Sequence, residues 1–105
     1  MTTKQFYRDE VEEGVDQVFY NVTSDQSLEE EMVYLLQNRS SDRIFWGFID
    51  VGDTVDEMDM SYLEEDGAIT IVHPDPAAKR IWVARPADYF GPINLIIGPE
   101  FLNIS

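Results

Sequence analysis

Negative charge is concentrated in the first two thirds of this chain, and it limits how the chain can fold. Residues 1–66 hold 18 of the 21 acidic side chains and four of the seven basic ones, for a net charge of −14. Residues 67–105 hold three of each and are neutral overall. A large field of one sign destabilises the compact state by self-repulsion and attracts partners of the opposite sign. The sequence therefore suggests a basic partner; the alternative is charge that only maintains solubility.

Size and composition predict a single domain over residues 1–105 with one small core. The chain is 44 % hydrophobic and 12 % aromatic, which is too apolar for intrinsic disorder. It contains no cysteine, so disulfides, thiolate nucleophiles and thiolate metal sites are excluded. The first residues lack the apolar run of a signal peptide, and no stretch approaches the roughly 20 apolar residues of a membrane span. We expect a cytoplasmic protein.

The charge balance also limits the ligands. Affinity for the phosphates of nucleic acids and for anionic membranes comes mainly from Lys and Arg, and this chain has seven bases against 21 acids. Direct binding to nucleic acid or to a membrane is therefore disfavoured. No Walker-type loop, nucleophile elbow or dinucleotide fingerprint occurs. We expect a protein that is not an enzyme and needs no cofactor, and the sequence does not specify an oligomeric state.

One helix is predicted over residues 28–38. Ser27 and Glu30 have the spacing of a capping box. Negative charge is favoured in a first helical turn, which accounts for the adjacent acids of residues 29–31. One face of this helix is apolar, at Leu28, Met32, Leu35 and Leu36.

Runs of β-forming residues predict strands at 42–50, 80–84 and 93–97. At the N-terminus we expect two further strands, at 5–11 and 18–22, which pair with each other. The spacing of Val11, Val15, Val18 and Val22 also suits a helix.

Residues 50–66 contain eight acids and no base. Thr54 and Glu57 have capping-box spacing, which would open a helix. The alternation of apolar and polar residues over 58–63 instead has the period of a strand, and we prefer the strand. A turn signal at 64–67 and β-formers at 68–73 then predict a hairpin. With residues 80–84 this hairpin would form a three-stranded meander.

These elements predict an α+β domain: a mostly antiparallel sheet of five or more strands, with the helix over residues 28–38 packed on one face. The core is expected from Phe45, Trp46, Phe48, Ile69, Ile71, Ile81 and Trp82.

Catalytic and metal chemistry find little support in the sequence. His73 is the only histidine and precedes Pro74, so we interpret it as an ordinary turn residue. Acids recur every three residues from Asp50 to Asp59, but they lack the EF-hand pattern of ligands and glycine. We expect a solvated acidic loop there and no metal site. Paired carboxylates can hydrolyse glycosides, but 21 acids in a short chain produce close pairs by chance.

The acidic segments are the best candidates for function. Carboxylates can occupy the positions of nucleic-acid phosphates and pair with Arg or Lys in a basic cleft. We therefore predict a non-enzymatic protein that inhibits or masks a nuclease or nucleic-acid-binding protein, as immunity and anti-defence proteins do. The predicted partner-binding residues are Asp53, Asp56, Glu57, Asp59, Tyr62, Glu64, Glu65 and Asp66.

Two other functions remain open. The first is an assembly subunit that docks through strand edges or through the apolar tail at residues 101–104. The second is a divalent-cation-binding protein or a small carboxylate enzyme.

Overall fold

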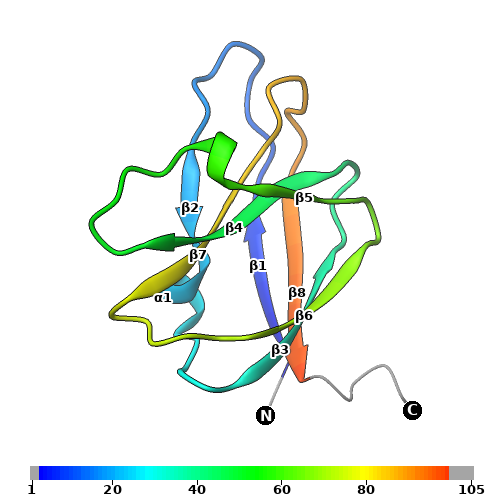
Figure 1. Ribbon diagram of the computed structural model, residues 1–105. Coiled ribbons are helices and arrows are strands. Elements are labelled where there is room, and N and C mark those ends of the chain that lie inside the picture. Colours follow the sequence, from blue (N-terminus) through cyan, green and yellow to red (C-terminus); the bar gives the residue numbers. More distant parts are fainter. Residues whose placement is uncertain (1–2, 100–105) are drawn as a thin grey trace.

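A computed structural model describes residues 3–99 (Figure 1). Within this range the chain forms eight strands, one five-residue α-helix and one short 3-10 helix. The elements are β1 (Lys4–Arg8), β2 (Phe19–Asn21), α1 (Val22–Gln26), β3 (Val33–Asn38), β4 (Ile44–Asp50), η1 (Glu57–Asp59), β5 (Ser61–Leu63), β6 (Ala68–Val72), β7 (Lys79–Ala84) and β8 (Ile93–Pro99).

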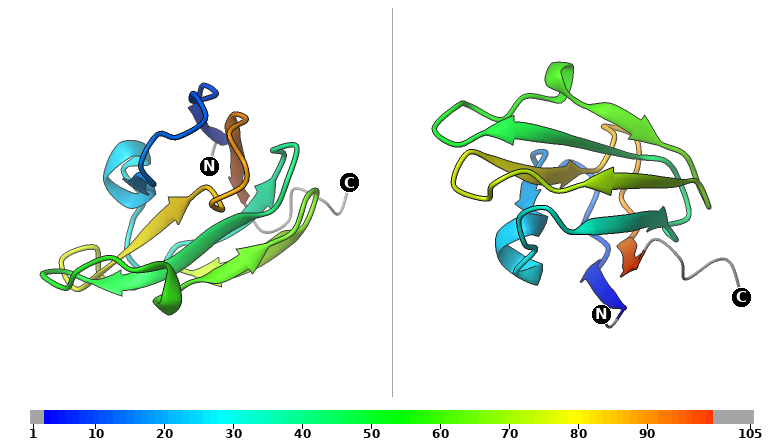
Figure 2. Two further views of the ribbon diagram at one scale, coloured as in Figure 1. Left: turned by 90° about the horizontal axis from the view of Figure 1, so that it is seen from above. Right: turned by 60° about the horizontal axis from the view of Figure 1, so that its bottom comes forward.

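The strands form two antiparallel sheets of four, in the orders β1-β8-β3-β6 and β2-β7-β4-β5. Figure 2 shows β1 and β8 on the opposite side of the molecule from β4 and β5. A sheet-rich, antiparallel fold was predicted correctly in outline, and its single short helix is compatible with the α+β class. The prediction of one sheet with five or more strands is wrong, because the strands divide between two sheets.

The core lies between the two sheets and takes side chains from both. Among the predicted core residues, Phe45, Ile71 and Ile81 are buried. Trp46, Phe48 and Ile69 are half-buried and pack against the core, and Trp82 is half-buried. Most of the fully buried apolar residues are absent from the predicted core. The absent residues are Phe6, Val22, Leu36, Ile44, Val83, Ala84, Ile93, Leu95 and Ile97.

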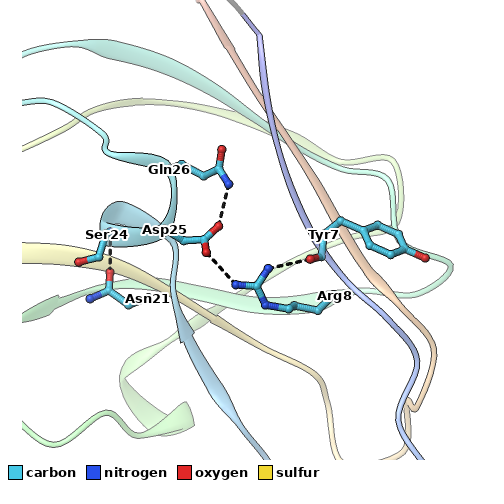
Figure 3. Close-up of polar contacts among 6 residues, drawn as sticks. All are labelled: Tyr7, Arg8, Asn21, Ser24, Asp25 and Gln26. Carbon is cyan, nitrogen blue, oxygen red and sulfur yellow. Dashed lines mark hydrogen bonds and ion pairs between the residues drawn. The ribbon is translucent and has the colours of Figure 1, made fainter.

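The helix predicted over residues 28–38 is wrong: this segment contains a loop and strand β3. Ser27, the expected helix cap, instead ends α1 in a left-handed conformation with φ of 52°. The observed cap is Asn21, whose Oδ1 accepts a hydrogen bond from a backbone N–H of α1 (Figure 3). Leu35 and Leu36 point to opposite faces of β3 and are both buried, so this strand is covered on both faces. It also pairs on both edges, with β6 and β8. A strand covered on both faces lacks the alternation that identifies it, and its pairing on both sides outweighs the local helix signal.

The predicted hairpin of 58–63 with 68–73 is also wrong. β5 pairs with β4, and β6 pairs with β3. The turn at 64–67 therefore carries the chain from one sheet to the other instead of closing a hairpin. The meander with 80–84 fails for the same reason, since β7 pairs with β2 and β4. The two N-terminal strands exist, but β1 pairs with β8 and β2 with β7.

Asn38, at the end of β3, joins the two sheets from a fully buried position. Its Nδ2 donates to the carbonyl oxygens of Asp42 and Leu63, at 2.9 Å each, and lies 3.2 Å from that of Glu64. Its Oδ1 accepts a hydrogen bond from Ser40 N at 2.9 Å. Asp42 precedes β4 and Leu63 ends β5. One amide therefore holds together two of the places where the chain passes between the sheets, from β3 to β4 and from β5 to β6.

Arg8, at the end of β1, links this strand to α1 (Figure 3). Its Nη2 donates to Asp25 Oδ1 at 2.8 Å, and its Nη1 donates to the carbonyl oxygen of Tyr7. The guanidinium carbon lies 4.4 Å from the centre of the Phe6 ring. Gln26 Nε2 donates to the second oxygen of Asp25. The hydrogen bond from Arg8, and then the one from Gln26, lower the pKa of Asp25 below its ordinary value.

Asp25→Asn is expected to remove a contact whose contribution depends on pH. An unfolded aspartate titrates near pH 3.9, and the lowered pKa means that the folded protein binds fewer protons just below that value. The contact therefore stabilises the fold above about pH 5, and its contribution is lost as the pH falls through the lowered pKa. The two side chains are 37 % and 32 % exposed, so we expect a loss of less than about 1 kcal/mol at pH 7.

Urea denaturation of both proteins, from pH 7 down to the lowest pH at which they remain folded, measures this contribution. The difference between them should shrink as the pH falls. A difference that stays constant or grows would contradict the assignment.

Candidate partner-binding surface

The eight residues predicted to bind a partner lie along one side of the β2-β7-β4-β5 sheet. They begin after β4, continue through η1 and β5, and end in the turn before β6 (Figure 1). Among residues 3–99, β5 is an outer strand of this sheet and pairs only with β4. All eight residues are exposed. We call them the acidic edge: Asp53, Asp56, Glu57, Asp59, Tyr62, Glu64, Glu65 and Asp66.

η1 replaces the first half of the strand predicted over residues 58–63. Asp56 Oδ1 accepts a hydrogen bond from Met58 N at 3.0 Å, so one carboxylate of the acidic edge caps this turn. Strand structure begins only at Ser61. The predicted alternation of faces is therefore lost before β5. The capping signal was real, but the cap is Asp56 and not Thr54.

Tyr62 is the aromatic member of the acidic edge and is 43 % exposed. Its ring stacks on Phe45, its direct partner across β4 and β5, with the ring centres 4.4 Å apart. The guanidinium carbon of Arg43 lies 4.1 Å from the centre of the same ring, which is a cation–π distance. These contacts fix the orientation of the ring. They also bring one positive charge to an otherwise negative surface.

Met58 is the most exposed large apolar residue in the described part of the chain, at 87 %. It lies in η1 between Glu57 and Asp59. Single exposed apolar residues are common on protein surfaces, but Met58 shares this edge with the exposed ring of Tyr62. Met and Tyr are enriched at protein interfaces. The acidic edge therefore combines charge with apolar contact area.

An open depression of about 370 Å³ lies beside the acidic edge, and Asp50, Asp53 and Asp59 are among its lining residues. Lys79 also lines it, and its Nζ is 3.1 Å from Asp50 Oδ1. Part of the negative charge is thus balanced by the chain itself. Within residues 3–99, no group of three or more His, Asp or Glu side chains is arranged to hold a metal ion.

A second pocket, of about 280 Å³, lies between the loops 9–18 and 85–92. Figure 1 shows both loops at the end of the molecule where η1 also lies. Sequence reasoning missed it. The spacing of the valines in the first loop predicts a strand or a helix, and no local signal indicates that they face the second loop. The apolar lining consists mainly of Val11, Val15, Val18, Pro86, Tyr89 and Phe90.

Arg85 holds these two loops together from a buried position, with 7 % of the residue exposed. Its Nε donates to the carbonyl oxygen of Gly91 at 2.7 Å, and its Nη2 donates to that of Asp9. Its Nη1 donates to the Tyr20 hydroxyl, and its carbonyl oxygen accepts a hydrogen bond from Gln17 Nε2. Among residues 3–99 it makes no ion pair. The Arg85 guanidinium therefore fixes the walls of the pocket through hydrogen bonds to uncharged oxygen atoms.

His73, predicted as an ordinary turn residue, directly follows β6, but its side chain is buried. Its Nε2 lies 2.8 Å from Thr23 Oγ1, and that hydroxyl also accepts a hydrogen bond from Ile81 N. The Nδ1 atom bonds the carbonyl oxygen of Pro74. Both ring nitrogens are thus occupied within the protein, so His73 has a structural role in the core.

Comparison with family models, curated proteins and solved structures found no match to this chain. Among residues 3–99, no helix has the length and apolar character needed to cross a membrane. The surface of the protein itself therefore carries the evidence for its function.

Proposed function

We propose that this protein is a non-enzymatic binding protein that inhibits or masks a basic partner, such as a nuclease or a nucleic-acid-binding protein. In this proposal the carboxylates of the acidic edge take the positions of nucleic-acid phosphates in the partner's cleft. They pair with Arg and Lys through charge-assisted hydrogen bonds. This is the mode of action of an immunity or anti-defence protein that mimics nucleic acid.

The observation that carries this proposal is the exposure of Met58 and Tyr62 among carboxylates. A face that serves only solubility needs no apolar side chain held in water. A docking face needs both kinds of group, because apolar anchors supply most of the affinity and the surrounding charges exclude wrong partners. Met58 is 87 % exposed and Tyr62 is 43 % exposed. The exposed carboxylates of the acidic edge lie on both sides of them in sequence.

The net charge of −14 supports the same proposal through association kinetics. A strongly negative surface accelerates encounter with a basic partner, and this effect weakens as salt rises. We therefore expect the partner to be captured efficiently at low salt and to remain bound, at reduced yield, at moderate salt. Capture of tagged protein from lysate, followed by mass spectrometry, identifies the candidates.

Charge reversal on the acidic edge is expected to weaken this binding at least about tenfold, which corresponds to about 1.4 kcal/mol. The variant Asp53→Lys/Asp59→Lys/Glu65→Lys avoids Asp56, which caps η1. Within residues 3–99 the side chains of these three acids make no hydrogen bond or ion pair, so the fold should be unchanged. Calorimetric titration of the captured partner measures the affinity, and circular dichroism checks the fold.

The triple variant of residues 29–31, each Glu→Lys, is the matched control. Both variants replace three negative charges with three positive ones and raise the net charge from −14 by the same amount. Residues 29–31 lie between α1 and β3, away from the acidic edge (Figure 1). The control should lose less than about threefold in affinity. Equal losses in both variants would show that only total charge matters, and no basic partner at all would refute the proposal.

An assembly role is the second candidate. β6 is an outer strand of its sheet, and its Val72 is 63 % exposed, so it can accept a further strand. The apolar tail at residues 101–104, the other predicted docking segment, lies outside the described residues. Concentration-dependent oligomers that survive high salt would favour this role over the inhibitor.

A further inference from the structure

The pocket between the loops 9–18 and 85–92 has the size of a site for one side chain. Its volume of about 280 Å³ is just below the range of about 300–1,000 Å³ typical of small-molecule sites. Its walls are held by the Arg85 hydrogen bonds and by the backbone bond from Val11 N to the carbonyl oxygen of Phe90, at 2.8 Å. A preformed pocket needs no ordering before it binds.

The charges at this pocket favour a cation as the occupant. Asp16 and Glu57 contribute to its lining and are both exposed. Gln17 Nε2 donates to Glu57 Oε2 at 3.1 Å and so orients that carboxylate. In the described part of the chain, Arg85 is the one cation that lines the pocket, and its guanidinium already donates to two carbonyl oxygens and a hydroxyl. The available charge is therefore negative, as is the field of the whole protein.

We propose that this pocket receives an arginine side chain of the basic partner, an inference that rests on the proposed function. The aliphatic stem packs on the valines of the 9–18 loop. The guanidinium stacks on the aromatic rings of the 85–92 loop and pairs with Glu57 or Asp16. Glu57 belongs to both the pocket and the acidic edge. The pocket is thus a specificity site that adjoins the acidic edge at η1.

The probe for this site is N-acetyl-arginine amide, with N-acetyl-citrulline amide as a neutral control of nearly the same shape. Titration of isotope-labelled protein at constant ionic strength, followed by amide resonances, reports where each probe binds. We expect saturable shifts confined to the two loops and to η1. The citrulline probe should bind at least about fivefold more weakly, because it cannot form the ion pair.

Glu57→Gln separates the pocket from the rest of the acidic surface. This variant keeps an oxygen acceptor for Gln17 and removes only the charge. It should weaken the arginine probe about three- to tenfold. Glu30→Gln, which makes the same change in the loop between α1 and β3, is the matched control and should leave binding unchanged.

Several results would overturn the inference. Shifts spread over all acidic loops without saturation would show unspecific screening. Equal binding of the two probes would show that the positive charge of arginine does not contribute to binding. Binding of N-acetyl-glycine through its carboxylate would show that Arg85 selects an anion instead. If the arginine probe binds but no basic partner is captured, the proposed function fails and the pocket remains. If a partner is captured but the probe does not bind, only the pocket fails.

Discussion

Asn38→Ala is expected to lower the free energy of unfolding by about 3 kcal/mol or more. The substitution removes the donor to the carbonyl oxygens of Asp42 and Leu63 and the acceptor for Ser40 N. Asn38 is fully buried, so water does not replace these bonds. A buried polar group without a partner costs about 1–3 kcal/mol, out of a total stability of about 5–15 kcal/mol for a domain.

Urea denaturation followed by circular dichroism measures this loss, and the melting temperature should fall by more than about 10 °C. Gln37→Ala is the control, because Gln37 is the half-buried neighbour of Asn38 in β3. It should cost less than about 1 kcal/mol. Equal losses for the two variants would show that the side-chain hydrogen bonds of Asn38 do not add to the stability of the fold.

Asn38→Asp tests the polarity of the same site. The new carboxylate keeps an acceptor for Ser40 N but turns a negative oxygen toward carbonyl groups. Its pKa in the folded protein should therefore lie above the ordinary value. The folded variant then binds more protons than the unfolded one, so its stability relative to the unsubstituted protein should rise as the pH falls. A difference that does not change between pH 8 and pH 5 would argue against this geometry.

The strands that the sequence predicts well are those with a strong local signal. Residues 42–50, 80–84 and 93–97 correspond to β4, β7 and β8, because runs of β-branched and aromatic residues suffice to identify them. β3 was missed because its pairing on both sides is not visible in sequence. The sheet order was missed for a related reason. The order depends on where the chain crosses between the sheets, and Asn38 holds two of these crossings together. A local turn signal does not indicate which sheet the next strand joins.

The candidate site also has one part that the sequence predicts and one part that it does not. The exposure of the acidic edge follows from charge alone, because Asp and Glu are almost never fully buried without a partner. The pocket, in contrast, can be recognised only in the folded structure. Arg85 and Asp9, whose hydrogen bond joins its two loops, are 76 residues apart in the chain. No spacing rule connects them, and an arginine in a loop is usually exposed.

Thr23→Val is expected to cost about 2–3 kcal/mol although the side chain hardly changes in size. The β2–β7 ladder stops at the pair of Asn21 with Trp82, where the chain turns into α1. The next N–H of β7, from Ile81, donates instead to Thr23 Oγ1 at 2.8 Å. The same hydroxyl bonds His73 Nε2 at 2.8 Å. Valine leaves both groups unpaired in the interior, and each such loss costs about 1–3 kcal/mol.

Thr23→Ser is the control, because it keeps the hydroxyl and loses one methyl group, at a cost of about 1 kcal/mol. Urea denaturation should therefore rank the valine variant as the less stable of the two. Amide hydrogen exchange gives a local readout: the Ile81 N–H should stay protected in the serine variant and exchange faster in the valine variant. If Ile81 is equally protected in both, the hydroxyl does not complete the ladder.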